Sequence, residues 1–119
     1  MKPEMSMNEN FNKLAVQFVD SVVAQNAAIE RHDPTVGNEF AKRYIEAADA
    51  LINGGREGIA TFAHLLNDER VAVRVMAASY LLPYRTSDAL PILEQAAQGK
   101  GITALGALMT LKRWKERKR

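Results

Sequence analysis

Apolar residues recur every three or four positions along nearly the whole chain, and this spacing restricts the fold more than any other feature of the sequence. Side chains at such intervals share one face of an α-helix. The alternating apolar and polar stretches that indicate β-strands are nearly absent. Helices are expected at residues 7–31, 36–52, 56–66, 69–82, 87–98 and from 102 onward. The pattern predicts an all-α protein with about six helices.

Residues that favour helix ends stand between these segments. Ser6 and Glu9 have the spacing of a capping box, in which each side chain bonds a free backbone N–H of the other residue. Further N-terminal caps are expected at Thr35, at Asp68 and at Thr86 or Ser87. The helix-ending signals are Pro34, Asn53-Gly54-Gly55, Pro83 and Gly99-Lys100-Gly101. Because the connections are short, neighbouring helices should pack as antiparallel hairpins.

The helix expected at 69–82 is apolar on almost every side. A helix of this kind is buried against more than one neighbour. We therefore expect it at the centre of the fold.

Residues 57–82 and 88–113 align with each other at an offset of about 31 residues. Each segment contains a short helix, a break, and a longer helix rich in Ala and Leu. Self-similarity on this scale is typical of helical repeat arrays, in which each hairpin buries its open face against the next.

The first of these segments resembles a HEAT repeat, and four residues carry the resemblance: Asp68, Val73, Arg74 and Ala77. In that family the Asp lies at the turn between the two helices of a repeat. The Asp and the Arg make hydrogen bonds that tie one repeat to the next. The resemblance therefore implies a structural role for Asp68 and Arg74.

The second segment matches the HEAT pattern less closely. Pro91 takes the place of a proline in the first helix of the family's repeat, whereas Gly99 and Leu105 replace the Asp and the Arg. The resemblance covers residues 55–113 and implies a right-handed superhelical stack of antiparallel helical hairpins. Residues 81–85 also resemble a small bacterial family of single HEAT-like domains that has no assigned function.

A chain of 119 residues predicts a single domain. Its expected parts are an N-terminal helical hairpin (6–53), HEAT-like unit one (54–83), a degenerate HEAT-like unit two (86–116) and a basic C-terminal tail (112–119).

The composition excludes several kinds of chemistry. With no cysteine, the chain can form neither disulfides nor cysteine-ligated metal sites, and thiol catalysis is excluded. Two histidines are too few for an all-histidine metal site. The glycines at 54–58 lack the Lys-Ser/Thr pair of a phosphate-binding loop. We therefore predict no catalytic residue, no metal and no cofactor, and interpret the chain as a non-enzymatic protein.

The basic character of the sequence is local. The net charge is +2 and the isoelectric point is about 9.0. Residues 112–119 contain six basic side chains against one acidic side chain, and the rest of the chain is mildly acidic. On a helix these six charges should point in all directions. The possible contacts of this tail, with nucleic acid as the alternative partner, are Lys112, Arg113, Lys115 and Arg117.

The function predicted from these patterns is the binding of a protein partner in a groove lined by the second helices of the hairpins. The expected contact residues are Arg70, Arg74, Tyr84 and Arg85. Two alternatives remain open: an immunity protein that neutralises a bacterial toxin, and a weak nucleic-acid binder. A homodimer is also possible if the end hairpin exposes its apolar face.

No segment has the length and apolarity of a membrane span, and the first ten residues lack the apolar core of a signal peptide. We therefore expect a cytoplasmic protein with no membrane partner.

Overall fold

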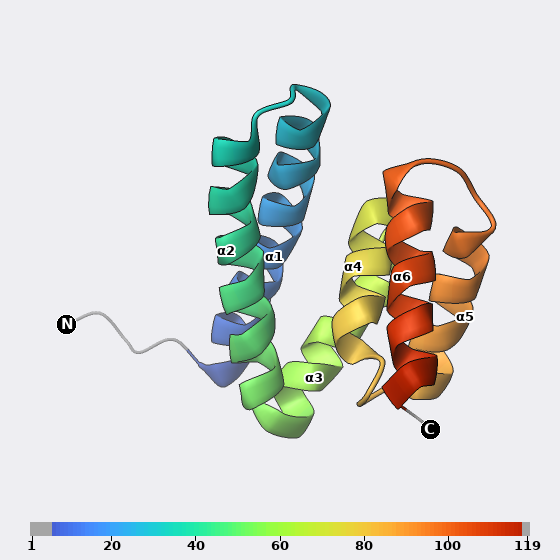
Figure 1. Cartoon of the computed structure of the whole chain (residues 1–119). Helices are drawn as coiled ribbons and strands as arrows, with labels where there is room; N and C mark the ends of the chain where they lie inside the picture. The colour runs from blue at the N-terminus through green and yellow to red at the C-terminus, as the bar shows by residue number, and fades with distance from the viewer. Residues whose placement is uncertain (1–5, 118–119) are drawn as a thin grey trace. The chain divides into compact units, whose positions relative to one another are not determined.

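The computed structural model describes residues 6–117, and every regular element in this range is helical (Figure 1). The elements are α1 (Met7–Glu30), α2 (Pro34–Asn53), α3 (Gly55–Ala63), the 3₁₀ helix η1 (His64–Asn67), α4 (Val71–Leu81), α5 (Thr86–Ala97) and α6 (Ile102–Arg117). The prediction of an all-α fold is confirmed. The contacts between residues divide the chain into two units, with the boundary between Phe62 and Ala63, and each unit is described by itself.

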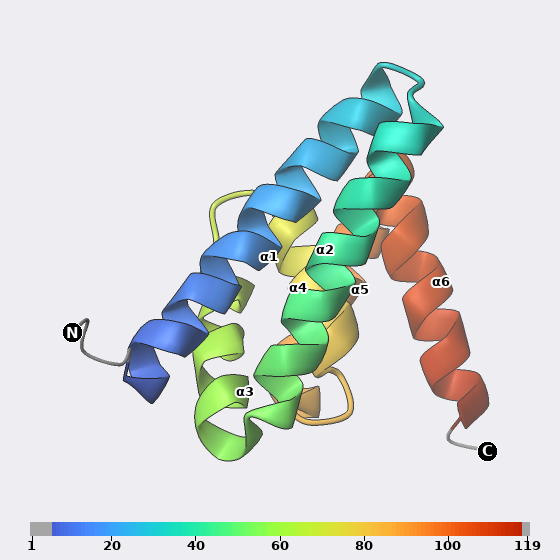
Figure 2. The same cartoon turned by 90° about the vertical axis from the view of Figure 1, so that its left-hand side faces the viewer.

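The first unit is built on an antiparallel hairpin in which α1 and α2 lie side by side along their lengths (Figure 2). The Phe18 ring is fully buried and meets two other rings edge to face. Its centroid lies 6.1 Å from that of Tyr44 and 4.9 Å from that of Phe62. Such pairs contribute about 0.5–1.5 kcal/mol each beyond the burial of apolar area. Burial also raises the pKa of Tyr44, which is a core residue.

The corner between α2 and α3 depends on glycine. Gly55 has φ 72°, in the left-handed region that favours glycine. A Cβ atom on Gly54 would lie 2.5 Å from the ring of Phe11. A Cβ atom on Gly58 would collide with the backbone oxygen of Leu51. The chain can therefore turn back tightly here and bury Phe11 against the corner.

Two of the predicted caps in this unit have different outcomes. The Ser6 hydroxyl accepts a hydrogen bond from the Glu9 backbone N–H at 3.2 Å, as the capping-box spacing predicts. The prediction that Thr35 caps α2 is wrong. This helix begins at Pro34, and the Asp33 carboxylate accepts a hydrogen bond from the Val36 N–H at 3.2 Å. Proline suits the first helical position because its missing N–H would have no partner there, so Thr35 lies inside the first turn.

In the second unit, α4, α5 and α6 pack against one another, and η1 packs against α4. α5 is antiparallel to α4 and α6, which run in the same direction (Figure 1). As predicted, α4 is largely buried and contacts both neighbouring helices. The buried apolar side chains of this unit are Leu66, Val73, Val75, Ala77, Ala78, Leu81, Leu82, Ala89, Leu93, Ala104 and Ala107.

Three predicted helix boundaries from α3 onward need correction. The helix expected at 56–66 ends at Ala63, and the chain continues as η1. α4 starts at Val71, so Asp68 is not its N-cap. α5 starts at Thr86, whose hydroxyl donates backwards to the Leu82 carbonyl at 2.7 Å. Neither Thr86 nor Ser87 caps α5. In both places the residue at the cap position is an arginine, Arg70 or Arg85, with no side-chain capping bond.

Candidate functional site

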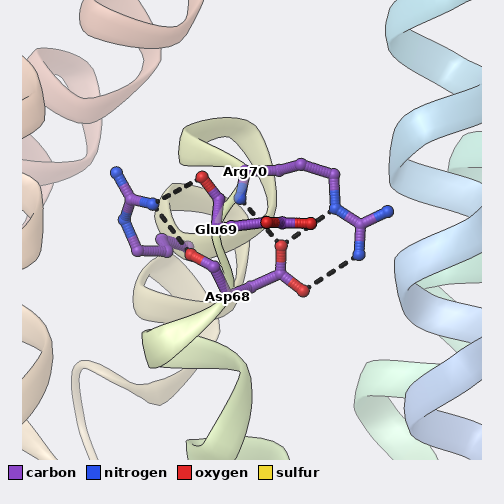
Figure 3. A network of polar contacts seen from close by, with 4 residues as sticks. Asp68, Glu69 and Arg70 are labelled. Atoms are coloured by element: carbon purple, nitrogen blue, oxygen red, sulfur yellow. Dashed lines mark hydrogen bonds and ion pairs between the residues drawn. The ribbon is translucent and has the colours of Figure 1, made fainter.

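The turn before α4 is held by two arginines (Figure 3). Arg70 donates to the Asp68 carboxylate three times: from its backbone N–H at 2.9 Å, from Nε at 2.9 Å and from Nη2 at 3.0 Å. Nη1 of Arg74 donates to the backbone oxygens of Asp68 at 2.8 Å and Glu69 at 3.1 Å. The hydrogen bond from the Arg70 side chain is the main cause that lowers the pKa of the Asp68 carboxyl, and the Arg70 backbone N–H and the positive charges of Arg70 and Arg74 lower it further.

The HEAT resemblance implies hydrogen bonds from Asp68 and Arg74 to the neighbouring repeat. Among residues 6–117, the side-chain hydrogen bonds of Asp68 and Arg74 all stay within residues 68–74. The two other residues of the motif, Val73 and Ala77, are fully buried on α4. The motif therefore stabilises its own turn and core.

A groove of about 460 Å³ lies between α4 and α6. We call it the α4–α6 groove. It is lined by Val75, Met76, Ser79, Tyr80, Leu82, Pro83, Gly106, Thr110, Arg113, Trp114 and Arg117. A Cβ atom on Gly106 would meet no other atom within 4 Å, so the missing side chain adds to the open space.

Two hydroxyl groups join the helices along this groove. The Ser79 hydroxyl donates to the Val75 carbonyl at 2.8 Å, and its oxygen lies 3.3 Å from the Thr110 hydroxyl oxygen. Because a hydroxyl has a single proton to donate, the Ser79 oxygen accepts from Thr110. Within the described residues, no imidazole or carboxylate lines the groove beside this pair.

Arg113 and Arg117 make one end of the groove cationic. They lie one helical turn apart on α6, and neither guanidinium forms an ion pair within the described part of the chain. The other two predicted tail residues, Lys112 and Lys115, are exposed and do not line the groove. Residues 118 and 119 of the predicted tail lie outside the described residues.

Two of the six tail charges, Arg113 and Arg117, nevertheless share the side of α6 that lines the groove. The signal was present in the sequence, because Gly106, Thr110, Arg113 and Arg117 recur at intervals of four, three and four residues. Residues with this spacing share one face of a helix.

The four residues expected to contact a partner do not form one site. Arg70 and Arg74 lie at the start of α4, whereas Tyr84 and Arg85 follow its end. Arg70 comes directly before the 11 residues of α4, which span about 16 Å, and Tyr84 and Arg85 come after them. Tyr84 is 52% exposed, and Arg85 lies 3.6 Å from the Asp88 carboxylate. None of the four lines the α4–α6 groove.

α6 also carries exposed apolar side chains outside the groove. Ile102, Leu105, Leu108 and Met109 are each at least half exposed. Such a face is what the expected homodimer would cover, and the homodimer stays a prediction.

Other kinds of site have little support in the part of the chain that the structure describes. No group of three or more His, Asp or Glu residues there could hold a metal ion. No helix in residues 6–117 combines the length and the apolarity that a membrane crossing requires.

Comparisons with known proteins show one structure with a similar fold and suggest no activity. No family model matches the chain, and no curated protein matches it. The crystal structure of the protein RPA1889 from Rhodopseudomonas palustris is similar, with a TM-score of 0.83 and 21% sequence identity over 95% of each chain. A likeness at this identity supports a common helical fold.

Proposed function

We propose that this protein is a non-enzymatic binding module that holds a segment of a partner protein in the α4–α6 groove. The observation that carries the proposal is the composition of the groove. Apolar side chains of α4 face the aromatic ring of Trp114 and the guanidinium groups of Arg113 and Arg117 on α6. Aromatic residues and arginine are the residues that most often dominate the free energy of protein interfaces.

The surroundings of the groove favour a protein segment over a small molecule. A volume of about 460 Å³ could accept either. The apolar surface, however, continues beyond the groove. Met109 follows Gly106 by three residues and precedes Arg113 by four, so it neighbours both on the surface of α6. Met109 is 52% exposed, and a bound segment could cover it together with the groove.

The polar groups of the groove fit recognition better than catalysis. A serine or threonine nucleophile needs an adjacent base. The described side chains that line the groove beside Ser79 and Thr110 include no histidine, aspartate or glutamate. The hydroxyl pair instead links α4 to α6 and helps to keep the groove rigid.

Peptide display on the purified protein tests the proposal. Selected peptides should bind the wild-type protein, and Gly106→Leu should weaken their binding by about tenfold or more, because a leucine would fill open space in the groove. Lys115→Leu is the matched control, since Lys115 is exposed on α6 away from the groove. Failure to enrich any peptide, or equal binding to the wild type and Gly106→Leu, would overturn the proposal.

Nucleic-acid binding is a second candidate because Arg113, Trp114 and Arg117 line the same groove. Bases stack on aromatic rings, and arginines bind phosphates. A fluorescent single-stranded oligonucleotide that binds at low salt, and loses affinity with Arg113→Gln, would support this candidate. The apolar floor formed by Val75, Met76 and Leu82 favours the protein segment.

A further inference from the structure

We infer that the segment bound in the α4–α6 groove is acidic and amphipathic, with carboxylates beside an apolar anchor. This inference rests on the proposed function and specifies the chemistry of the partner. It depends on the two arginines at the end of the groove and on the apolar side chains across from them.

The arginines supply the charge argument. Arg113 and Arg117 line one groove from successive turns of α6, and neither forms an ion pair within residues 6–117. No acidic side chain from residues 6–117 lines the groove. A guanidinium group presents N–H donors in a planar fork that matches a carboxylate. Two carboxylates one helical turn apart in a bound segment would match the two guanidinium groups.

The anionic group must be held by these side chains rather than by the backbone. Both arginines lie near the C-terminal end of α6, where the helix dipole is negative and disfavours anions. Replacing them should therefore remove nearly all of the attraction for a carboxylate. None of the groove residues that the structure describes lies in the first turn of a helix, so no helix N-terminus among them compensates.

The apolar part of the groove supplies the second half of the argument. Val75, Met76 and Leu82 come from α4 and its end, whereas the arginines come from α6. A segment lying between the helices would present apolar side chains on one side and carboxylates on the other. Lys112 and Lys115 lie outside the groove, so the cations that line it do not form the longer track that a phosphate backbone follows.

Matched peptides and matched variants test this inference. Peptides enriched on the wild-type protein are synthesised twice, once as selected and once with each Asp and Glu replaced by Asn and Gln. Binding is measured by fluorescence anisotropy on the wild type and on the variant Arg113→Gln/Arg117→Gln. The control is Lys112→Gln/Lys115→Gln, which removes the same charge from α6 outside the groove. Circular dichroism verifies that each variant is folded.

We expect the neutral peptides to bind the wild type about tenfold more weakly than the acidic peptides. The preference should vanish on the arginine variant and persist on the lysine control. If the enriched peptides lack acidic residues, or if both peptide versions bind equally, the inference is wrong and the proposed function still stands. If no peptide is enriched, both fail. An oligonucleotide that binds more tightly than every peptide, with the same dependence on the arginines, would also overturn the inference.

Discussion

The hydroxyl oxygens of Ser79 and Thr110 lie 3.3 Å apart although the residues are 31 positions apart in the sequence. This separation equals the offset at which residues 57–82 and 88–113 align. The same offset relates Val75 to Gly106 and, one position beyond the two segments, Pro83 to Trp114, and all six residues line the groove. Equivalent positions of the two aligned segments therefore face each other across it. The groove is open partly because Gly106, which corresponds to Val75 in the first segment, has no side chain to fill it.

The coupling between these hydroxyl groups can be measured with a double-mutant cycle. Ser79→Ala and Thr110→Val should each lower the free energy of unfolding by about 0.5–1.5 kcal/mol, because each removes a partly buried hydrogen bond. The double variant should lose less than the sum of the single losses. Urea unfolding of the four proteins gives the coupling energy. Strictly additive losses would mean that the two hydroxyl groups do not interact.

The sequence predicted the helices well and the groove poorly, for different physical reasons. Periodic spacing and helix-breaking residues such as Pro83 act locally, so they identify helices without knowledge of their neighbours. Which face of α6 meets α4 is decided by packing between the helices. The face that carries Arg113 and Arg117 therefore had the right spacing in the sequence, but nothing local placed it against α4.

Substitutions at Asp33 and Thr35 test which of these two residues caps α2. Asp33→Ala should lower the free energy of unfolding by about 0.5–2 kcal/mol, because it removes the bond to the Val36 N–H. Thr35→Ala is the control. Thr35 is exposed in the first turn, so its loss should change stability by less than about 0.5 kcal/mol. Thermal unfolding of both variants measures the difference, and a larger effect at Thr35 would contradict the observed cap.

The glycines of the two units should respond in opposite ways to alanine. Gly58→Ala would push a Cβ atom into the Leu51 carbonyl oxygen and close to the Phe11 ring, so we expect a loss of about 1–3 kcal/mol. Gly106→Ala meets no atom within 4 Å and should stabilise α6 by about 0.5–1 kcal/mol. Chemical denaturation measures the free energy of unfolding of both variants and of the wild type. A Gly58→Ala variant as stable as the wild type would refute the close approach at this corner.

Two of the contact residues predicted from the sequence also make local bonds that residue type alone does not reveal. Arg74 and Arg85 are polar residues next to helix ends, which makes them candidates for contacts with a partner. In the structure, Arg74 binds backbone oxygens of its own turn, and Arg85 lies beside Asp88. Such local bonds depend on the path of the turn, which periodicity does not specify.

The stability supplied by Asp68 should depend on pH in a defined direction. Its pKa is lowered in the folded protein, chiefly by the Arg70 side chain. A carboxylate with a lowered folded pKa stabilises the protein above its unfolded pKa, about 3.9, and this stabilisation is lost as the pH falls through the folded value.

Asp68→Asn keeps a similar shape without the charge. The variant should be less stable than the wild type at pH 7, by about 1 kcal/mol or less because Arg70 is half exposed. The difference should shrink steadily as the pH falls below about 4. Urea unfolding between pH 2.5 and 7, roughly the range over which a carboxylate titrates, measures it. Asp49→Asn, at an exposed position on α2 with no ion pair among the described residues, is the control. A difference for Asp68→Asn that stayed constant over this range would show that the charge of Asp68 does not stabilise the turn.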